Sequence, residues 1–260
     1  MKRAAITPPT ATEETYEFET WTLITKKSHI LPSKTSMSPC SNHQLAFYSI
    51  SLPHLPDMVF PDNILRIQHT NGSGIEFNAL EALKLVNDKE DVIKVAVAEA
   101  WKESRAGVEV SHKVSHPFDW TFTTDYSGTV FGDATVEATD LRIDMEKLKQ
   151  KEKILFFDEI HLYEDELADH GCASCSIKVR VMPSGFFVLL RFYLRVDDVL
   201  IRINDTRLYY EKSKEYILRE YTSRQSKTKD LKVPRVFWGD PNEISHHLPL
   251  STSTFEKISF

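Results

Sequence analysis

Hydrophobic and polar positions alternate most clearly in residues 176–211. Before Pro183, β-branched residues occupy every second position and basic residues lie between them: Ile177, Val179 and Val181 alternate with Lys178 and Arg180. A period of two with β-branched residues is typical of a β-strand. The turn residues 183–185 close this strand, and a second strand is predicted over Phe186–Val196.

The run Phe186–Val196 is apolar at every even position, whereas its odd positions change from apolar to basic residues along the run. This pattern predicts a central strand that a helix or a second sheet covers only at the end near Phe187 and Leu189. Asp197-Asp198 is a turn pair, after which Val199–Ile203 is the predicted returning strand. The three strands are predicted to form an antiparallel meander at the centre of the core.

Shorter patterns predict the other elements. Strands are expected at residues 16–25, 64–69, 118–124, around 128–136, 154–163 and 215–222. Residues 92–105 fit a strand at their start, and their end fits either a strand or a helix. Loops are expected at residues 32–42, 164–169 and 227–232.

Three helices are predicted from caps and spacing. Asn78 is the N-cap of a helix that places Leu80, Leu83 and Val86 on one face. The second helix covers residues 144–153, with Met145, Leu148 and Ile154 turned inward. Asp240 caps the third helix, with Pro241 at its first position.

Many short strands with a few short helices indicate an α+β fold, a single domain of mostly antiparallel β-sheet. Residues 1–15 are rich in Thr, Pro and Glu without periodicity and are expected to form a disordered tail. Residues 16–260 are expected to form the domain.

Composition narrows the function. The net charge of −6 gives no general attraction to nucleic acid or anionic membranes. No apolar run reaches the roughly 20 residues that span a bilayer, and the N-terminus lacks the apolar core of a secretory signal. With 3 Cys and no such signal, the thiols are expected to stay reduced. We therefore expect a soluble, cytoplasmic protein.

The motif Cys172-Ala-Ser-Cys175 could be a redox pair or half of a zinc site. A zinc site needs four ligands, and only His161 and His170 lie near. A redox pair favours a helix N-terminus, whereas Cys175 leads into a predicted strand. Chance small residues at a strand start are the simpler interpretation.

Other polar clusters give equally weak signals. His161, Asp165 and Asp169 would share one face of a helix, as metal ligands do, but the aromatic run before them favours a strand, which scatters them. The pair His246-His247 is expected at the surface. The sequence contains no GxSxG, P-loop, dinucleotide or HExxH motif, which lowers the prior for an enzyme without excluding a dispersed site.

Basic and aromatic residues are interleaved on the predicted meander: Arg180, Arg191, Arg195, Arg202 and Arg207 with Tyr193 and Tyr209. They could stack single-stranded nucleic acid, or pair with an acidic partner segment. They could also form a solvated sheet face whose Arg side chains pair with nearby acids. The negative net charge makes nucleic acid the weakest of the three interpretations.

Several blocks together resemble one known family. They are DNILRIQHTNGSGIEFNALEAL, FDWTFTTDYSGT, EKLKQKEKILFF, YEDELADHG, RVMPSGFFVLLRFYLRVDDVLIRINDTRLYYE, YILREYTSRQSK and NEISHHLP. In this order they resemble the TOR signalling pathway regulator-like (TIPRL) family, over nearly the whole chain from about Tyr16. The motif Cys172–Cys175 is outside the family pattern.

The resemblance implies an α+β regulator, without enzymatic activity or cofactor, that binds the catalytic subunits of type 2A protein phosphatases and modulates their activity and assembly in TOR-linked signalling. Inhibition of the phosphatase is the expected direction of its effect. The implied partner-binding residues are Glu81, Ile143, Ile203 and Asp205, with Asp205 at a corner after the third meander strand. The family pattern has Asp at position 81 and Met at position 203, so both differences keep charge or apolarity.

In the expected mechanism, Ile143 and Ile203 form an apolar floor, and Glu81 and Asp205 are rim charges. Core packing is the alternative role for the two isoleucines, and capping of a turn is the alternative for Asp205. A rim position predicts that Asp205→Leu weakens binding and leaves the melting temperature nearly unchanged. The alternative function from another class is a metal- or thiol-dependent enzyme with a dispersed site.

Overall fold

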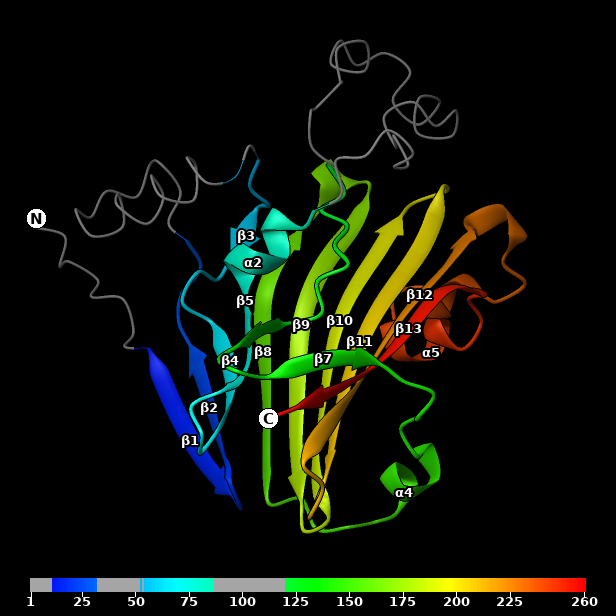
Figure 1. The fold of residues 1–260 in the computed structure, drawn as a ribbon. Helices are drawn as coiled ribbons and strands as arrows, with labels where there is room; N and C mark the ends of the chain where they lie inside the picture. Colours follow the sequence, from blue (N-terminus) through cyan, green and yellow to red (C-terminus); the bar gives the residue numbers. More distant parts are fainter. Residues whose placement is uncertain (1–10, 32–51, 53, 87–119) are drawn as a thin grey trace, which may run out of the picture.

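The computed structural model describes residues 11–31, 52, 54–86 and 120–260. In this part the chain forms two antiparallel sheets (Figure 1). The large sheet has the strand order β3-β8-β9-β10-β11-β12-β13-β7, and the small sheet has the order β1-β2-β4-β5-β6. Mostly antiparallel sheet with short helices confirms the predicted fold class.

The predicted meander is confirmed and forms the centre of the large sheet. Its strands are β9 (Gly171–Met182), β10 (Gly185–Val196) and β11 (Leu200–Glu211). The third strand continues eight residues beyond the predicted end at Ile203, because Asn204, Asp205 and Thr206 stay in register with β10. The corner predicted at Asp205 is therefore wrong: this residue lies in the middle of a strand.

The even positions of β10 pack into the core between the two sheets, as their unbroken apolar pattern predicts. There Phe186 stacks on Tyr210 and meets Trp21 of the small sheet edge-on, with ring centroids 5.1 Å and 5.7 Å apart. One buried cluster thus joins both sheets.

The flanking strands of the large sheet extend or add to the predictions. The expected strands at 154–163 and 215–222 are β8 (Phe156–Asp165) and β12 (Tyr216–Lys227). Two strands of the large sheet were not predicted, β3 (Met58–Val59) and β13 (Leu250–Ser259), and neither was β5 of the small sheet. Short 3-10 helices occupy Leu167–Asp169, Thr228–Asp230 and Arg235–Phe237, within or beside the predicted loops.

The small sheet begins with a hairpin where one strand was predicted. β1 (Thr12–Phe18) pairs with β2 (Trp21–Lys27) across a turn at Glu19, whose φ of 54° is left-handed. Residues 12–15 thus lie in a strand and not in a tail, while residues 1–10 are outside the described part. The predicted strand β4 (Ile64–His69) is confirmed and pairs with β5 (Gly74–Asn78).

The segment between the sheets corrects two further predictions. Residues 128–136 form two short strands, β6 (Thr129–Phe131) in the small sheet and β7 (Thr135–Ala138) in the large sheet. Residues 120–124 form no strand beyond a single bridge of Thr124 to Val86. Hydrogen bonds to the Phe122 and Thr124 carbonyls anchor this segment instead. The predictions at 32–42, 92–105 and Phe118 lie outside the described residues.

Both predicted helix caps, Asn78 and Asp240, are confirmed, and Asp144 is a third cap that was not predicted. Side chains of Asn78, Asp144 and Asp240 accept backbone N–H bonds at the starts of α2 (Ala79–Lys84), α4 (Met145–Lys149) and α5 (Pro241–Ser245). α4 is shorter than predicted: Leu148 is buried, but Met145 and Ile154 are 41% and 52% exposed, which contradicts their inward placement. Within the described ranges, no helix has the length and apolarity to cross a membrane.

Candidate partner-binding surface

The large sheet has a rear face that points away from the small sheet, formed by the odd positions of β10 and β11. Two small apolar clusters cover parts of it. The sequence predicted that this face of β10 is covered only near Phe187 and Leu189, whereas the structure covers it at both ends. One cluster, beside α4, contains Ile143, Leu148, Met182, Tyr209 and Leu218. The other, beneath α5, contains Tyr193, Ile201, Ile203, Ile244 and Leu248.

Between these clusters the strand register places polar and apolar side chains in two rows. One row runs Glu159, Lys178, Leu189, Arg207 and Glu220 across β8 to β12. The next row runs His161, Ser176, Arg191, Asp205 and Thr222. We call these two rows together the rear surface.

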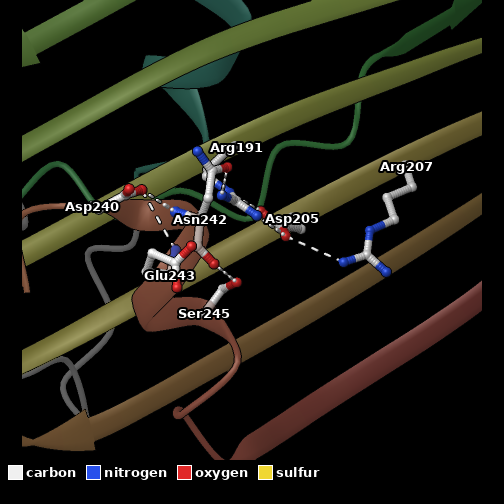
Figure 2. A network of polar contacts seen from close by, with 7 residues as sticks. All are labelled: Arg191, Asp205, Arg207, Asp240, Asn242, Glu243 and Ser245. Carbon is white, nitrogen blue, oxygen red and sulfur yellow. Dashed lines mark hydrogen bonds and ion pairs between the residues drawn. The ribbon is translucent and has the colours of Figure 1, made fainter. Parts of the chain in front are cut away.

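Asp205 lies at the centre of the rear surface and is only 3% exposed. Its carboxylate accepts two hydrogen bonds from Arg191, from Nε at 2.7 Å and from Nη2 at 2.8 Å. Arg207 approaches from the other side, with Nη2 3.5 Å from Oδ2. Figure 2 shows the two guanidinium groups on either side of this carboxylate. Such a forked pair fixes both side chains in one orientation.

Arg191 also holds α5 against the sheet. Its Nη1 donates a hydrogen bond of 2.9 Å to Oδ1 of Asn242, on the first turn of α5 (Figure 2). The Asp240 side chain caps the same helix, and Ile244 packs into the apolar cluster beneath it. One buried ion pair in the sheet and one surface helix are therefore coupled through a single guanidinium.

The rear surface combines exposed basic side chains with two buried carboxylates and one partly exposed carboxylate, Glu159. The side chains of Lys178 and Arg207 are 44% and 29% exposed, whereas Asp205 and Glu220 are 3% and 8% exposed as residues. Glu220 uses its Oε1 to accept the backbone N–H of Ile143 at 2.7 Å. Lys178 is paired with Glu159 at 3.2 Å, and the Glu159 side chain is 36% exposed, so a partner meets this acceptor as well as the donors of Lys178 and Arg207.

The structure brings three of the four residues implied by the resemblance to this face. Asp205 lies on the rear surface, and Ile143 and Ile203 lie in the clusters that flank it, 5% and 1% exposed. Glu81 is elsewhere: it lies on α2, whose buried residues pack into the core on the opposite face of the large sheet. Its side chain pairs with Lys84 at 2.7 Å. The four residues therefore do not form one groove.

The Arg and Tyr residues singled out from the sequence are divided between the two faces. Tyr193 and Tyr209 are 4% and 5% exposed and belong to the rear clusters, so their rings are not available for base stacking. Arg202 points to the opposite face, where Gln225 accepts from its guanidinium. This burial removes the stacking platforms that the nucleic-acid interpretation needs.

The two cysteines also lack the geometry of a redox pair. Cys172 and Cys175 are three residues apart on β9 and point to opposite faces. Burial raises the pKa of the Cys175 thiol to about 12 and raises that of Cys172 as well. Both groups are therefore protonated thiols near neutral pH, which makes them poor nucleophiles and poor metal ligands.

The predicted scattering of the acidic and histidine residues is confirmed. His161 is exposed and contacts Glu164 at 3.0 Å, whereas Asp165 is buried and accepts backbone N–H bonds from Asp57 and Leu167. Burial raises the pKa of Asp165 to about 6. Among the described residues, no three His, Cys, Asp or Glu side chains are grouped so as to hold a metal ion.

The forked pair of Arg191 and Asp205 was not predicted, although the sequence contained a signal for it. The loop of three residues, 197–199, pairs Val196 with Leu200 and therefore Arg191 with Asp205, whereas a two-residue turn at Asp197-Asp198 would pair Arg191 with Asn204. An opposite-charge pair at facing positions of an otherwise apolar hairpin indicates a buried ion pair.

Comparisons with known proteins give one consistent family. A model of the TIP41-like family matches residues 58–232, more than half of the chain. The TIP41-like protein of Homo sapiens is 51% identical over 248 residues, which cover 94% of this chain and 88% of the human protein. The TIP41-like protein of Rattus norvegicus is 50% identical over 255 residues, covering 96% and 91%.

A more distant relative has a name that states an activity. The "Type 2A phosphatase activator TIP41" of Saccharomyces cerevisiae is 31% identical over 269 residues, covering 92% of this chain and 73% of the yeast protein. The matches confirm the resemblance found in the sequence. The chain belongs to the TIP41-like family.

Proposed function

We propose that this protein is a regulatory protein, not an enzyme, that binds the catalytic subunit of type 2A serine/threonine phosphatases. It acts in the cytoplasm, within TOR-linked signalling, and needs no cofactor. The names of two fungal relatives support the phosphatase as partner, because both are called type 2A phosphatase activators. We further propose that direct binding inhibits the catalytic subunit, a sign opposite to the one in those names.

The rear surface is the proposed contact. One observation carries this assignment: Asp205 holds Arg191 by two hydrogen bonds and leaves Arg207 only a 3.5 Å contact. Arg207 thus keeps N–H donors for a carboxylate or carbonyl of a partner. Leu189 lies between Lys178 and Arg207 in the same row and offers apolar area beside these donors. Polar contacts around an apolar centre are the usual anatomy of a protein interface.

The residues implied by the resemblance receive different roles in this proposal. Asp205 positions the two arginines, and the flanking clusters of Ile143 and Ile203 shape the surface without a large exposed area of their own. Glu81 requires a partner that also reaches the opposite side of the large sheet. We propose it as a second, separate contact.

Calorimetry with a purified type 2A catalytic subunit tests the proposal. The wild-type protein is expected to bind one-to-one, and Arg207→Glu to weaken binding about tenfold, since it reverses a charge at an interface. Lys151→Glu is the matched control, because Lys151 is exposed and lies outside the rear surface. Equal melting temperatures of the two variants show that the loss is one of contact.

Each outcome bears on a distinct part of the proposal. No heat of binding with folded wild-type protein overturns the phosphatase as partner. Binding that Arg207→Glu and Lys151→Glu weaken equally overturns the rear surface but keeps the partner. A rise in phosphatase activity on binding overturns inhibition and agrees with the name of the yeast relative.

A further inference from the structure

A second feature of the surface lies outside the rear surface. It is an open pocket of about 1130 Å³ where the turn between β10 and β11, the end of β12 and residues 229–233 meet. In Figure 1 this is the region where β12 leads through an orange loop toward α5. None of the residues that line it belongs to the two rows of the rear surface. The pocket is therefore a separate candidate site.

The inner wall of the pocket is apolar. It is formed by Val199, Leu200, Leu231, Val233 and Pro249. Leu200 is part of the main core and Leu231 and Val233 pack against the cluster beneath α5, so the wall rests on buried structure at both sides. A volume somewhat above the usual ~300–1,000 Å³ of small-molecule pockets suits a peptide segment with side chains larger than methyl groups.

The rim of the pocket is basic. Lys227, Lys229 and Lys232 line it and are exposed. In the described part of the chain, these three ammonium groups form no ion pair with a carboxylate. Of the two rim acids, Asp198 is already paired with Arg235 at 2.8 Å, which leaves Asp230 against three lysines. Such a local excess of positive charge contrasts with the net charge of −6 of the whole chain.

We propose that this pocket is a docking site for an acidic linear segment of a partner protein, with one or two large apolar side chains between its carboxylates. The apolar side chains enter against Leu231 and Val233, where burial supplies affinity. The flanking carboxylates face the lysines of the rim, which sets orientation and speeds association. The site is independent of the proposed phosphatase contact.

Fluorescence anisotropy with synthetic peptides tests this proposal on the full chain. The probe is a labelled glutamate-rich peptide that carries one Phe and one Leu in its middle. A second peptide with both apolar residues replaced by Ser keeps the charge and removes the anchors. The first peptide is expected to bind about tenfold more tightly than the second, and its affinity is expected to fall with added salt.

Two double variants locate the binding. Lys229→Glu with Lys232→Glu reverses two rim charges, and Lys151→Glu with Lys153→Glu makes the same change of net charge at exposed positions outside the pocket. The first pair is expected to weaken binding of the peptide at least about tenfold, and the second pair to leave it within about twofold.

Three results would overturn the proposal. The first is no binding of the Phe- and Leu-containing peptide to the folded wild-type chain. The second is equal loss in both double variants, or equal affinity of the two peptides, because either indicates general attraction between charges. The third is tighter binding of a single-stranded oligonucleotide than of the peptide, which would assign the lysines to phosphate groups.

Discussion

Arg191 and Asp205 face each other directly across β10 and β11 and form a two-point ion pair within the sheet. Their side chains are 13% and 3% exposed, so the pair is largely removed from water. Removal of one partner from such a pair leaves the other charge buried without compensation, which is more destabilising than the loss of an exposed pair. The pair therefore makes Asp205 structural as well as central to the surface.

Asp205→Asn is expected to lower the free energy of unfolding by about 3–5 kcal/mol, the usual range for a broken buried pair. Urea unfolding and the melting temperature measure this loss. The result reverses the expectation for a solvated rim residue, whose substitution would leave the melting temperature nearly unchanged.

A matched control uses an exposed pair. Glu146 and Lys149 are 2.7 Å apart, with side chains 82% and 68% exposed. Glu146→Gln is expected to cost less than about 0.5 kcal/mol, as surface pairs usually do. Equal effects of the two amide substitutions would show that the Asp205 pair is no more than a surface contact.

The cap of α5 gives a second prediction. Asp240 accepts the backbone N–H of Asn242 at 2.8 Å, and Asn242 in turn binds Arg191. Asp240→Ala is expected to lower stability by about 1 kcal/mol, the usual loss for an N-cap. Because the helix is short, hydrogen exchange of the amides of Asn242 and Glu243 is expected to quicken.

Ser245→Ala is the control for the cap. Ser245 is the last residue of α5, and its hydroxyl donates a hydrogen bond to the carbonyl of Asn242 without contacting the capped N–H groups. Exchange in α5 that is as fast in Ser245→Ala as in Asp240→Ala would contradict a specific role of the cap.

Two glycines in the described part allow a comparison of strain with and without a clash. A Cβ on Gly171 would lie 1.9 Å from the carbonyl oxygen of Arg195, and φ there is +150°. Gly72 has a φ of +90°, but a Cβ would meet no atom within 4 Å. Gly72→Ala carries only the conformational cost of about 1–2 kcal/mol, whereas Gly171→Ala adds a collision with a strand backbone.

We therefore expect Gly171→Ala to destabilise the protein by about 3 kcal/mol or more, at least twice the effect of Gly72→Ala. Chemical denaturation of both variants under the same conditions measures the difference. A larger loss for Gly72→Ala would mean that the turn before β5 controls stability more than the pairing of β9 with β10.

The features that the sequence predicted well are those encoded within a few neighbouring residues. The meander follows from alternation in 176–203, and two N-caps follow from Asn78 and Asp240 directly before helical segments. Such signals depend on local sterics and backbone hydrogen bonds, which are the same whatever the tertiary contacts of the segment.

The features that were missed depend on contacts between distant segments. Residues 120–124 alternate like a strand, but the Tyr163 hydroxyl and the Asn204 amide satisfy their carbonyls in place of a neighbouring strand. Asp205 was expected at a corner because Asp favours turns, yet its partner Arg191 compensates its charge inside the sheet. Tertiary partners of this kind override local preference.

Asp165 gives the last prediction, a dependence of stability on pH. Burial raises its pKa from the ordinary 3.8 to about 6 in the folded protein. Between these two values the folded state binds a proton that the unfolded state has lost, so stability falls as pH rises through this window. One pKa unit corresponds to about 1.4 kcal/mol, and partial contact with water reduces the total effect to about 1–2 kcal/mol.

Asp165→Asn removes this titration. The unfolding free energy of the wild-type protein relative to that of Asp165→Asn is therefore expected to fall by about 1–2 kcal/mol between pH 4 and pH 7. Taking the difference between the two proteins cancels the titration of other groups. A difference that stays constant, or that rises with pH, would contradict a raised pKa. It would mean instead that the N–H bonds from Asp57 and Leu167 outweigh burial and stabilise the ionised carboxylate.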